Sequence, residues 1–455
     1  MSDGLIKKYG LPTAIAMVIG IVIGSGVFFK AEKILTATGG NLPLGILAWV
    51  VGGIIMIACA YTFSVMASRY ERVNGIVDYA EAAMGKGYGY YVGWFMAIIY
   101  YPTLTSVLAW VSARYTAVLF GWSITGGECM TVAAFYLVAS YTLNALSPIL
   151  AGKFQVTSTV IKLVPLALMA VVGTVFGLSN GMIARNFTTI LVKVDTATAL
   201  FTAVVATSFA YEGWIIATSI NSELKNSKKN LPIALVAGTF IVMLTYILYY
   251  VGLSGAVANE TLMSGGQEGA KLAFATLFSN LGGTLIFVFV IVSCLGTLNG
   301  LMLGCTRGVY SISVRKRGPR PDLFSQVDPI TNMPTNSAIL GLFLSGVWLL
   351  FFYGANLTAP WFGFFCFDSS ELPIVTIYAM YIPIFIMFMK KETDLSAFKR
   401  FIMPTLALAG SLFMIVAACF AHRMAVVAYL IVFAAVMALG ALFSKEKLTI
   451  KPIVS

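Results

Sequence analysis

The sequence predicts an all-α protein that crosses a membrane many times. Of its 455 residues, 59% are hydrophobic and only 10% are charged, whereas a soluble domain carries roughly 45–50% apolar and about 25% charged residues. So few charges could not cover the surface of a water-soluble globule of this size. Apolar runs recur along the whole chain, and each is long enough to cross ~30 Å of hydrocarbon as a helix. No alternating strand pattern appears, so only helices fit.

Twelve spans are predicted, joined by short loops. The first six are expected at Leu11–Ala37, Leu42–Ser68, Tyr88–Phe120, Met130–Leu146, Phe154–Leu178 and Ala199–Ile220. The second six are expected at Leu231–Ala256, Gly282–Val314, Thr335–Tyr353, Pro360–Met389, Phe401–Phe420 and Ala425–Phe443. Because the connecting loops are short, we expect no separate soluble domain.

The placement of basic residues predicts the orientation of the chain. With the N-terminus inside, the inner segments hold Lys7, Lys8, Arg69, Arg72, Lys86, Lys153, Lys225, Lys228, Lys229, Arg315, Lys316, Arg317, Arg320, Lys390, Lys391, Lys399, Arg400, Lys445, Lys447 and Lys451. The outer segments hold only Arg185, Lys193, Lys271 and Arg423. By the positive-inside rule, both termini are expected in the cytoplasm of a multi-pass plasma (inner) membrane protein. The net charge of +11 is therefore a topology signal and predicts no nucleic-acid partner.

Cysteine and histidine usage argues against a metal site or catalytic chemistry. The six cysteines nearly all fall inside apolar spans and form no CxxC or Cys/His cluster, which indicates neither a disulfide framework nor a metal site. The single histidine, His422, excludes HExxH zinc chemistry and any histidine-dependent triad, and its short outer turn suggests a surface position. No Walker motif is present. We therefore expect no enzyme, no cofactor and no metal.

The strongest local signal lies in the first span, in the stretch Gly20-Ile-Val-Ile-Gly24-Ser25-Gly26-Val27-Phe28. Each glycine weakens a helix by ~1 kcal/mol relative to alanine. Amides loosened in this way must face protein or a cavity, because hydrocarbon offers them no partner. A helix broken here would present free N–H groups, which suit a carboxylate. The alternative is close helix packing through the GxxxG pair Gly20 and Gly24.

The sixth span holds a counterpart, Ser208-Phe209-Ala210-Tyr211-Glu212-Gly213-Trp214. Glycine-interrupted spans at matching positions of two halves predict an inverted-repeat transporter with its binding site at the midplane. We accordingly expect one transmembrane domain over residues 1–443 and a cytoplasmic tail over 444–455. The first repeat would cover about 11–178, the second about 199–389, and two appended helices about 401–443.

Two charged residues stand out inside the apolar helices. Lys162 lies about two turns into the fifth span, where an intramembrane lysine is by default a functional hypothesis; snorkelling of its long stem to the surface is the alternative. Glu212 is the matching anion, and it either contacts the substrate or is a solvated acid in a water-filled vestibule. Further charged residues at membrane depth receive no role from the sequence, namely Arg114, Arg307, Asp368 and Glu371.

At Gly24-Ser25-Gly26-Val27-Phe28 and Phe209-Ala210-Tyr211-Glu212-Gly213-Trp214, the chain resembles the amino acid–polyamine–organocation (APC) superfamily. Within it, the chain is most similar to the L-amino acid transporter (LAT) family, which includes bacterial neutral amino acid exchangers. The likeness covers nearly the whole chain and implies a LeuT-like fold, a five-plus-five inverted repeat with broken helices 1 and 6.

The resemblance also implies roles for individual residues. The substrate carboxylate would meet the backbone N–H groups of Ser25 and Gly26, and its α-ammonium would meet the carbonyls of Val22, Phe209 and Glu212. Phe209 would also gate the site. Lys162 would stand where related sodium-coupled carriers hold an ion and would link helix 1 to Tyr246, which implies sodium independence. Tyr101 replaces a small residue of close relatives, which implies a smaller side-chain pocket.

The sequence therefore predicts a Na⁺-independent antiporter that moves small neutral L-amino acids by alternating access, with helices 3, 6, 8 and 10 selecting the side chain. Alternatives are a cationic amino acid or polyamine carrier, a proton-coupled symporter, and a non-transporting nutrient sensor or membrane-embedded enzyme. Beyond the lipid bilayer and its substrate, the sequence identifies no partner subunit, and we interpret Cys129 as a free thiol.

Overall fold

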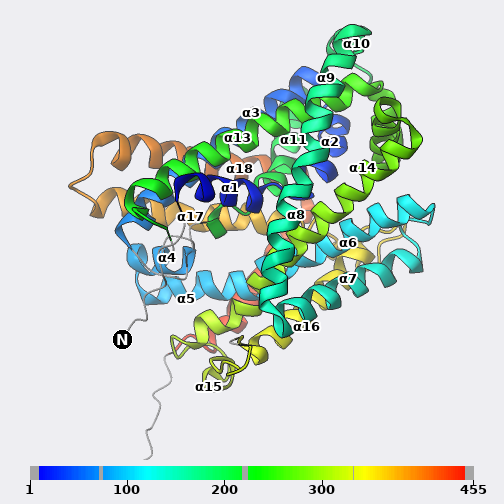
Figure 1. The fold of residues 1–455 in the computed structure, drawn as a ribbon. Helices are drawn as coiled ribbons and strands as arrows, with labels where there is room; N and C mark the ends of the chain where they lie inside the picture. Colours follow the sequence, from blue (N-terminus) through cyan, green and yellow to red (C-terminus); the bar gives the residue numbers. More distant parts are fainter. Residues whose placement is uncertain (1–9, 71–74, 218–223, 332, 446–455) are drawn as a thin grey trace, which may run out of the picture.

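The computed structural model describes residues 10–70, 75–217, 224–331 and 333–445, and the chain there is a bundle of helices (Figure 1). In this part of the chain, ten helices or continuous helical runs are long and apolar enough to cross a membrane. The expected tail lies outside the described residues from 446 onward, as do the inner basic residues Lys7, Lys8, Arg72, Lys447 and Lys451.

The first half of the chain contains α1 (Leu11–Val22), α2 (Gly26–Ala37), α3 (Leu42–Arg69), α4 (Ile76–Met84), α5 (Lys86–Phe95), the π-helix η1 (Met96–Tyr100), α6 (Tyr101–Phe120), α7 (Gly127–Leu146), α8 (Pro148–Leu168), the π-helix η2 (Met169–Gly173), α9 (Thr174–Ser179), α10 (Met182–Thr188), α11 (Thr196–Tyr211) and α12 (Trp214–Ala217). The second half contains α13 (Ser227–Ala256), α14 (Asn259–Ser313), α15 (Pro321–Phe324), α16 (Thr335–Ala355), η4 (Gly363–Phe365), α17 (Leu372–Lys391), the π-helix η5 (Phe398–Ile402), α18 (Met403–His422) and α19 (Met424–Ala441).

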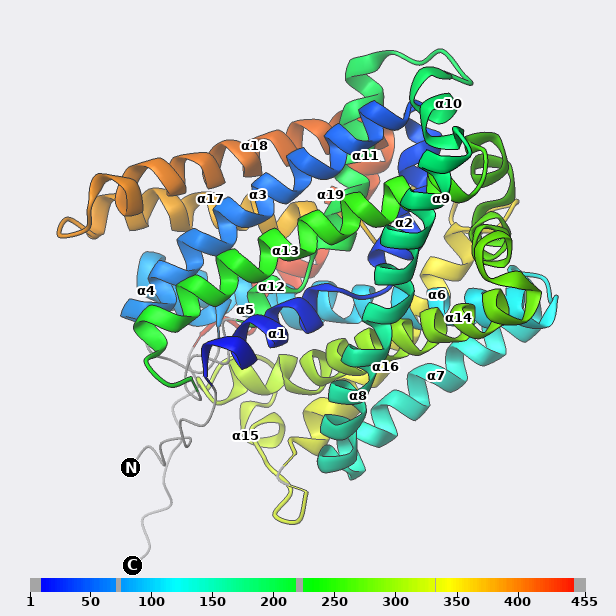
Figure 2. The ribbon, with the colours of Figure 1, turned by 45° about the horizontal axis from the view of Figure 1, so that its top comes forward.

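The first and sixth predicted spans are each interrupted, at the positions where the sequence places glycine. Figure 2 shows α1 and α2 as separate helices joined by an extended stretch. In the sixth span, α11 ends at Tyr211, and Glu212 follows in an extended conformation with φ −75° and ψ 159°. Gly213 then adopts φ 107°, a conformation that costs glycine little and other residues much. Both spans therefore consist of shorter helices that end inside the bundle.

Two parts of the second half differ from the sequence expectation. The tenth span begins at Leu372 and not at Pro360, because residues 356–371 form a loop with one turn of 3₁₀ helix and Pro373 starts the helix. The apolar residues of this loop raised its hydropathy to that of a span. The eighth span is the end of α14, whose earlier part turns sharply at Gly266 and again at Phe278 and Ser279. The predicted spans give no sign of the helical segments at 259–278.

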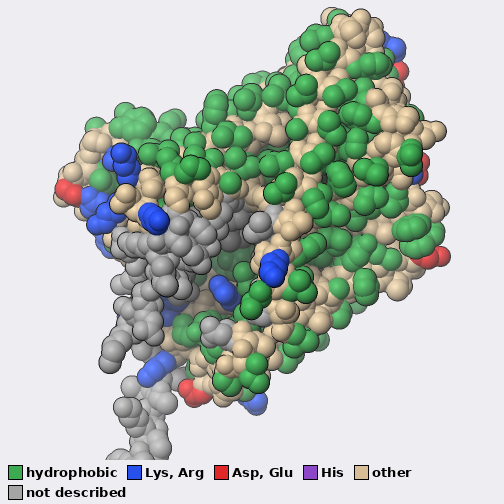
Figure 3. All heavy atoms as spheres, viewed as in Figure 1, with side chains coloured by type: hydrophobic (Ala, Val, Ile, Leu, Met, Phe, Trp, Pro, Cys, Tyr) green, Lys and Arg blue, Asp and Glu red, His purple; other side chains and the backbone are tan. Residues whose placement is uncertain are grey.

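Packing gives one large core, a second small cluster around Tyr90 and Trp94, and a largely apolar exterior. Pairs of helices far apart in sequence lie against each other, with α13 on α3, α14 on α6 and α8, and α11 on α2. Hydrophobic side chains cover most of the visible face, while Lys and Arg gather toward its left and lower left (Figure 3). An exterior of this kind suits lipid, where exposed Leu, Ile, Val and Phe carry no penalty.

Candidate functional site

The break between α1 and α2 lies in the middle of the bundle. Val22 is the last residue of α1, and the N–H groups at the start of α2, from Gly26 onward, have no intrahelical carbonyl to bond. A Cβ atom added at Gly26 would lie 2.3 Å from Cα of Ala210 in α11. Glycine is therefore required here because the two broken spans touch backbone to backbone. The N-terminus of α2 is held next to the end of α11.

The other two glycines of this stretch serve close packing. A Cβ atom at Gly20 would lie 2.4 Å from Cγ2 of Thr159 in α8, and one at Gly24 would lie 2.4 Å from Oγ1 of Thr297 in α14. The sequence offered a broken helix and close helix packing as alternatives. In the structure the first span has both properties, and its packing against α8, α14 and α11 fixes where the break lies.

Tyr246 of α13 joins the ends of the two broken spans. Its hydroxyl lies 3.1 Å from the carbonyl oxygen of Val22 and 3.0 Å from that of Ala210, and it can donate its proton to either. Its ring stacks on Tyr211 with centroids 5.3 Å apart. These contacts tie the C-terminal end of α1 to that of α11. The resemblance gives the Val22 carbonyl to the substrate ammonium, and this oxygen keeps a lone pair for that role even when Tyr246 donates to it.

Lys162 of α8 reaches the same break. Its side chain is fully buried, and Nζ donates a hydrogen bond to the carbonyl oxygen of Gly20. Among the described residues no Asp or Glu lies within salt-bridge distance of it. Lys162 does not snorkel to the surface, so the structure excludes that alternative. Its ammonium group contacts α1 two residues before that helix ends at Val22.

Glu212 is also buried, so it is not a solvated acid. Its Oε1 accepts a hydrogen bond from the hydroxyl of Tyr100, which belongs to the π-helix η1. Its Oε2 has no hydrogen-bond partner among the described residues. A buried oxygen without a partner is costly, and it is therefore available to a group that enters the site. Sequence reasoning did not anticipate Tyr100 in this position.

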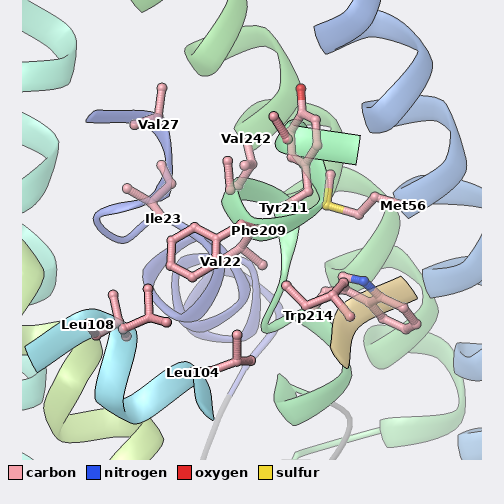
Figure 4. Packing of buried hydrophobic residues seen from close by; sticks show 14 of the residues in the cluster. Val22, Ile23, Val27, Met56, Leu104, Leu108, Phe209, Tyr211, Trp214 and Val242 are labelled. Carbon is pink, nitrogen blue, oxygen red and sulfur yellow. The ribbon is translucent and has the colours of Figure 1, made fainter. Parts of the chain in front are cut away.

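Phe209 of α11 lies beside the break and contacts α2. Figure 4 shows its ring beside Val22 and Ile23. The ring meets Phe29 of α2 edge to face, with centroids 5.9 Å apart. The ammonium of Lys30 lies 5.1 Å from the centroid of the Phe209 ring. Lys162, Tyr246 and Phe209 thus contact the ends of the broken helices. The other residues expected at the site, Val22, Ser25, Gly26 and Glu212, are the residues at those helix ends.

A second set of charges lies close by, of which the sequence pointed only to Asp368 and Glu371, without a role, and not to Lys30. Lys30 of α2 is buried and forms an ion pair with Glu371, which also contacts His422. The prediction that His422 is a surface residue was wrong, because its ring faces the interior of the bundle at the end of α18. The signal that identified Lys162, a lysine inside an apolar span, was present at Lys30 as well. Among the described residues no group of His, Cys, Asp and Glu could hold a metal ion.

Comparison with known proteins gives one family match, two related sequences and one related structure. Residues 9–443 match the family described as "Amino acid permease". The serine/threonine exchanger SteT of Bacillus subtilis is 30% identical over 420 residues, which cover 91% of each chain. The human b(0,+)-type amino acid transporter 1 is 25% identical over 78% of this chain and 76% of its own length. The crystal structure of MhsT in complex with L-phenylalanine superposes with a TM-score of 0.55 over 93% of this chain and 98% of that one, at 14% identity, which shows a shared LeuT-like fold.

Proposed function

The chain belongs to the amino acid permease family of the APC superfamily, as its motifs predicted, and from this premise we propose that it exchanges small neutral L-amino acids without sodium. Membership makes it a multi-pass membrane transporter of amino acids and not an enzyme. The cargo class, the exchange mode and the sodium independence are the proposed part. Alternating access would proceed through two repeats, about 11–178 and 199–389, with both termini in the cytoplasm of the plasma membrane.

The contact between the two broken spans is the observation that carries the proposal. A zwitterion has a carboxylate and an ammonium on one carbon, so its site needs N–H donors and carbonyl acceptors side by side. The N-terminus of α2 supplies donors at Ser25 and Gly26, and helix N-termini favour anions. The carbonyls of Val22, Phe209 and Glu212 lie at the C-terminal ends of α1 and α11 and would accept from the ammonium.

Lys162 supports sodium independence. Sodium in a protein site needs several oxygen ligands, and the ammonium of Lys162 already takes the carbonyl of Gly20 as its acceptor. A fixed cation there would repel a second one over a few ångströms of low-dielectric interior. The proposed role of Lys162, with Tyr246, is to relay closure of the two broken spans to the rest of the bundle.

The preference for small side chains rests on Tyr101. A Cβ atom at Gly304 of α14 would lie 2.8 Å from Cδ1 of Tyr101, so this ring fills space between α6 and α14. α6 belongs to the third span and this part of α14 to the eighth. A large aromatic ring between them leaves less room for a cargo side chain. SteT is a serine/threonine exchanger, and a small cargo for this chain agrees with that likeness.

A second candidate is a carrier of cationic amino acids or polyamines, and Glu212 favours it. The buried Oε2 of Glu212, which has no hydrogen-bond partner in the described part of the chain, would pair with a distal ammonium or guanidinium, which removes the cost of an unpaired buried group. Competition separates the candidates. Inhibition of L-serine uptake by L-alanine but not by lysine, arginine or putrescine supports the first; the reverse order supports the second.

The test of the exchanger is uptake of radiolabelled L-serine or L-alanine into proteoliposomes in sodium-free buffer. Vesicles are compared with and without about 1 mM unlabelled amino acid inside, a concentration at the upper end of usual KM values. We expect uptake only into the loaded vesicles. Equal uptake into empty vesicles would contradict exchange and indicate symport or uniport, and stimulation by a pH gradient would identify a proton-coupled symporter.

A further inference from the structure

The carboxyl group of Glu212 is buried and, among the described residues, has no counter-ion. Its Oε1 accepts a hydrogen bond from the hydroxyl of Tyr100, and its Oε2 has no partner in the described part of the chain. The N–H of Gly213 also faces the carboxyl group. No Lys, Arg or His that the structure describes lies within salt-bridge distance of it. These polar neighbours are therefore neutral and do not balance the charge of an ionised Glu212.

The titratable side chains around Glu212 are phenols and one thiol. They are Tyr100 and Tyr101 of the third span, Cys59 of α3, and Tyr378 and Tyr381 of α17. Phenols and thiols are uncharged near neutral pH. The hydroxyl of Tyr381 is buried and, like Oε2 of Glu212, has no hydrogen-bond partner among the described residues. The described elements that pack around Glu212 thus surround it with aromatic rings and neutral dipoles and contribute no charge.

An ionised carboxyl group is costly in such surroundings. Moving an isolated carboxylate from water into a low-dielectric interior costs so much that the group takes up a proton instead. Lys162 does not supply the missing positive charge, because its ammonium bonds to the carbonyl of Gly20. The buried Lys30 is paired with Glu371. The surroundings of Glu212 therefore favour the protonated carboxyl group when the site is empty.

The charge of the cargo changes this balance. The backbone carbonyl of Glu212 is proposed to accept from the α-ammonium of the substrate, so the carboxyl group of the same residue lies beside the cargo. A neutral cargo adds no positive charge to its side-chain pocket, and the carboxyl group keeps its proton. A cargo with a distal ammonium brings the missing charge and pairs with the carboxylate. It also lies against tyrosine rings, which attract organic cations.

We propose that Glu212 holds an exchangeable proton that keeps the charge of the loaded site constant, with the carboxyl group protonated beside a neutral amino acid and ionised beside a cationic one. The proposal rests on the proposed function, since it needs an amino acid cargo. When a cationic cargo enters, the O–H bond at Oε2 breaks and the proton leaves to the water on the side to which the site is open. One exchange cycle then moves a neutral amino acid and a proton in one direction and a cationic amino acid in the other, without net movement of charge.

The first test reads the proton directly and needs no transport. Infrared difference spectra of the purified protein in lipid nanodiscs, wild type minus Glu212→Gln, are recorded at neutral pH without an amino acid. We expect the carbonyl-stretch band of a protonated carboxyl group in the wild type. Glu260→Gln is the matched control and should leave this band unchanged, because the Glu260 side chain is 57% exposed and paired with Arg185. Absence of the band from the wild type would overturn the proposal.

Tyr100→Phe gives a second measurement that does not depend on the folding of Glu212→Gln. The Tyr100 hydroxyl donates to Oε1, which is the carbonyl oxygen when the proton is on Oε2. Loss of this hydrogen bond strengthens the C=O bond, so the band should move to higher wavenumber. A band that Tyr100→Phe leaves in place would belong to another carboxyl group and would overturn the proposal.

The second test adds cargo to the same samples. L-lysine should remove the band, and L-alanine should leave it. Release of one proton also requires the affinity for L-lysine to rise about ten-fold for each unit of increasing pH, as long as the empty site is protonated, whereas the affinity for L-alanine should change less than about two-fold. Glu212→Gln should remove the pH dependence of L-lysine binding.

Three outcomes of the second test would overturn the proposal alone: L-lysine that binds and leaves the band, L-lysine that binds with an affinity independent of pH, and a site that binds L-alanine but no L-lysine. A protein that binds neither amino acid would contradict the proposed function, and the exchange of proton for cation would fall with it. The spectrum without cargo distinguishes this case, because it reports the proton on Glu212 whether or not an amino acid binds.

Discussion

The contact of Gly26 with Ala210 leads to the sharpest prediction, for the substitution Gly26→Ala. The added methyl carbon would lie 2.3 Å from the Cα of Ala210, and ordinary contact begins at 3.4 Å. The start of α2 and the end of α11 must then separate by about 1 Å, because backbone cannot turn aside as a flexible side chain can. Overpacking of this kind costs about 1–3 kcal/mol. A shift of about 1 Å in groups that bind a reacting or transported molecule can reduce a rate up to about 100-fold.

The assay combines exchange in proteoliposomes with the melting temperature of the purified protein. Gly26→Ala should lower the exchange rate at least about ten-fold and lower the melting temperature. The matched control is Gly152→Ala in α8, where an added Cβ meets nothing within 4 Å and a helix gains up to about 1 kcal/mol from the change. Wild-type exchange by Gly26→Ala, with Gly152→Ala also normal, would refute the argument that the two broken spans form the site by direct contact.

Three further results are expected. Lys162→Ala leaves the buried carbonyl of Gly20 without its donor, at about 1–3 kcal/mol, and should reduce sodium-free exchange at least about ten-fold; unaltered exchange would contradict the relay. Tyr246→Phe keeps the ring and removes the hydroxyl, whose hydrogen bond contributes about 0.5–1.5 kcal/mol to stability. The exchange rate should fall several-fold while the melting temperature changes little. A large loss of stability with normal exchange would argue against a role in closure. Arg69 donates to Asp394 and so lowers the pKa of the Asp394 carboxyl. The unfolded chain takes up that proton at a higher pH than the folded chain does. The ion pair therefore stabilises the fold fully above about pH 4, and this stabilisation is lost as the pH falls through the lowered folded pKa. The difference in melting temperature between wild type and Asp394→Asn should therefore shrink on acidification, and a constant difference would show that the ion pair is not its cause.

Hydropathy and glycine placement were sufficient to predict the helical bundle and the breaks in its first and sixth spans. Both signals are local, since a helix needs a continuous apolar run to cross lipid and glycine loosens the backbone where it stands. The same reasoning failed at residues 360–371. Their aromatic side chains are as apolar as those of a span, but they form a loop before Pro373, and hydropathy does not report backbone shape.

The contacts of the site could not be derived in this way. Tyr246 and its two carbonyl partners lie 224 and 36 residues apart, and Lys30 and Glu371 are separated by 341 residues. Only the family resemblance pointed to Tyr246. Nothing local distinguishes Lys30 from a lysine that reaches the surface, or His422 from a residue in an exposed turn, until packing brings Glu371 between them.

The π-helix η1 divides the third span into α5 and α6, and the side chains of α6 point in directions rotated from those that one continuous α-helix would give. A π-turn holds one residue more than an α-turn, and each residue of an α-helix advances the side-chain direction by about 100°. The additional residue at Met96–Tyr100 therefore rotates everything on α6 relative to α5, and it does so at the tyrosine that meets Glu212. The side chains by which α5 packs on its neighbours and the side chains that α6 presents to the site therefore do not follow one continuous helical repeat. Substitutions that retune specificity can accumulate on one side of the bulge while the packing register on the other side stays intact.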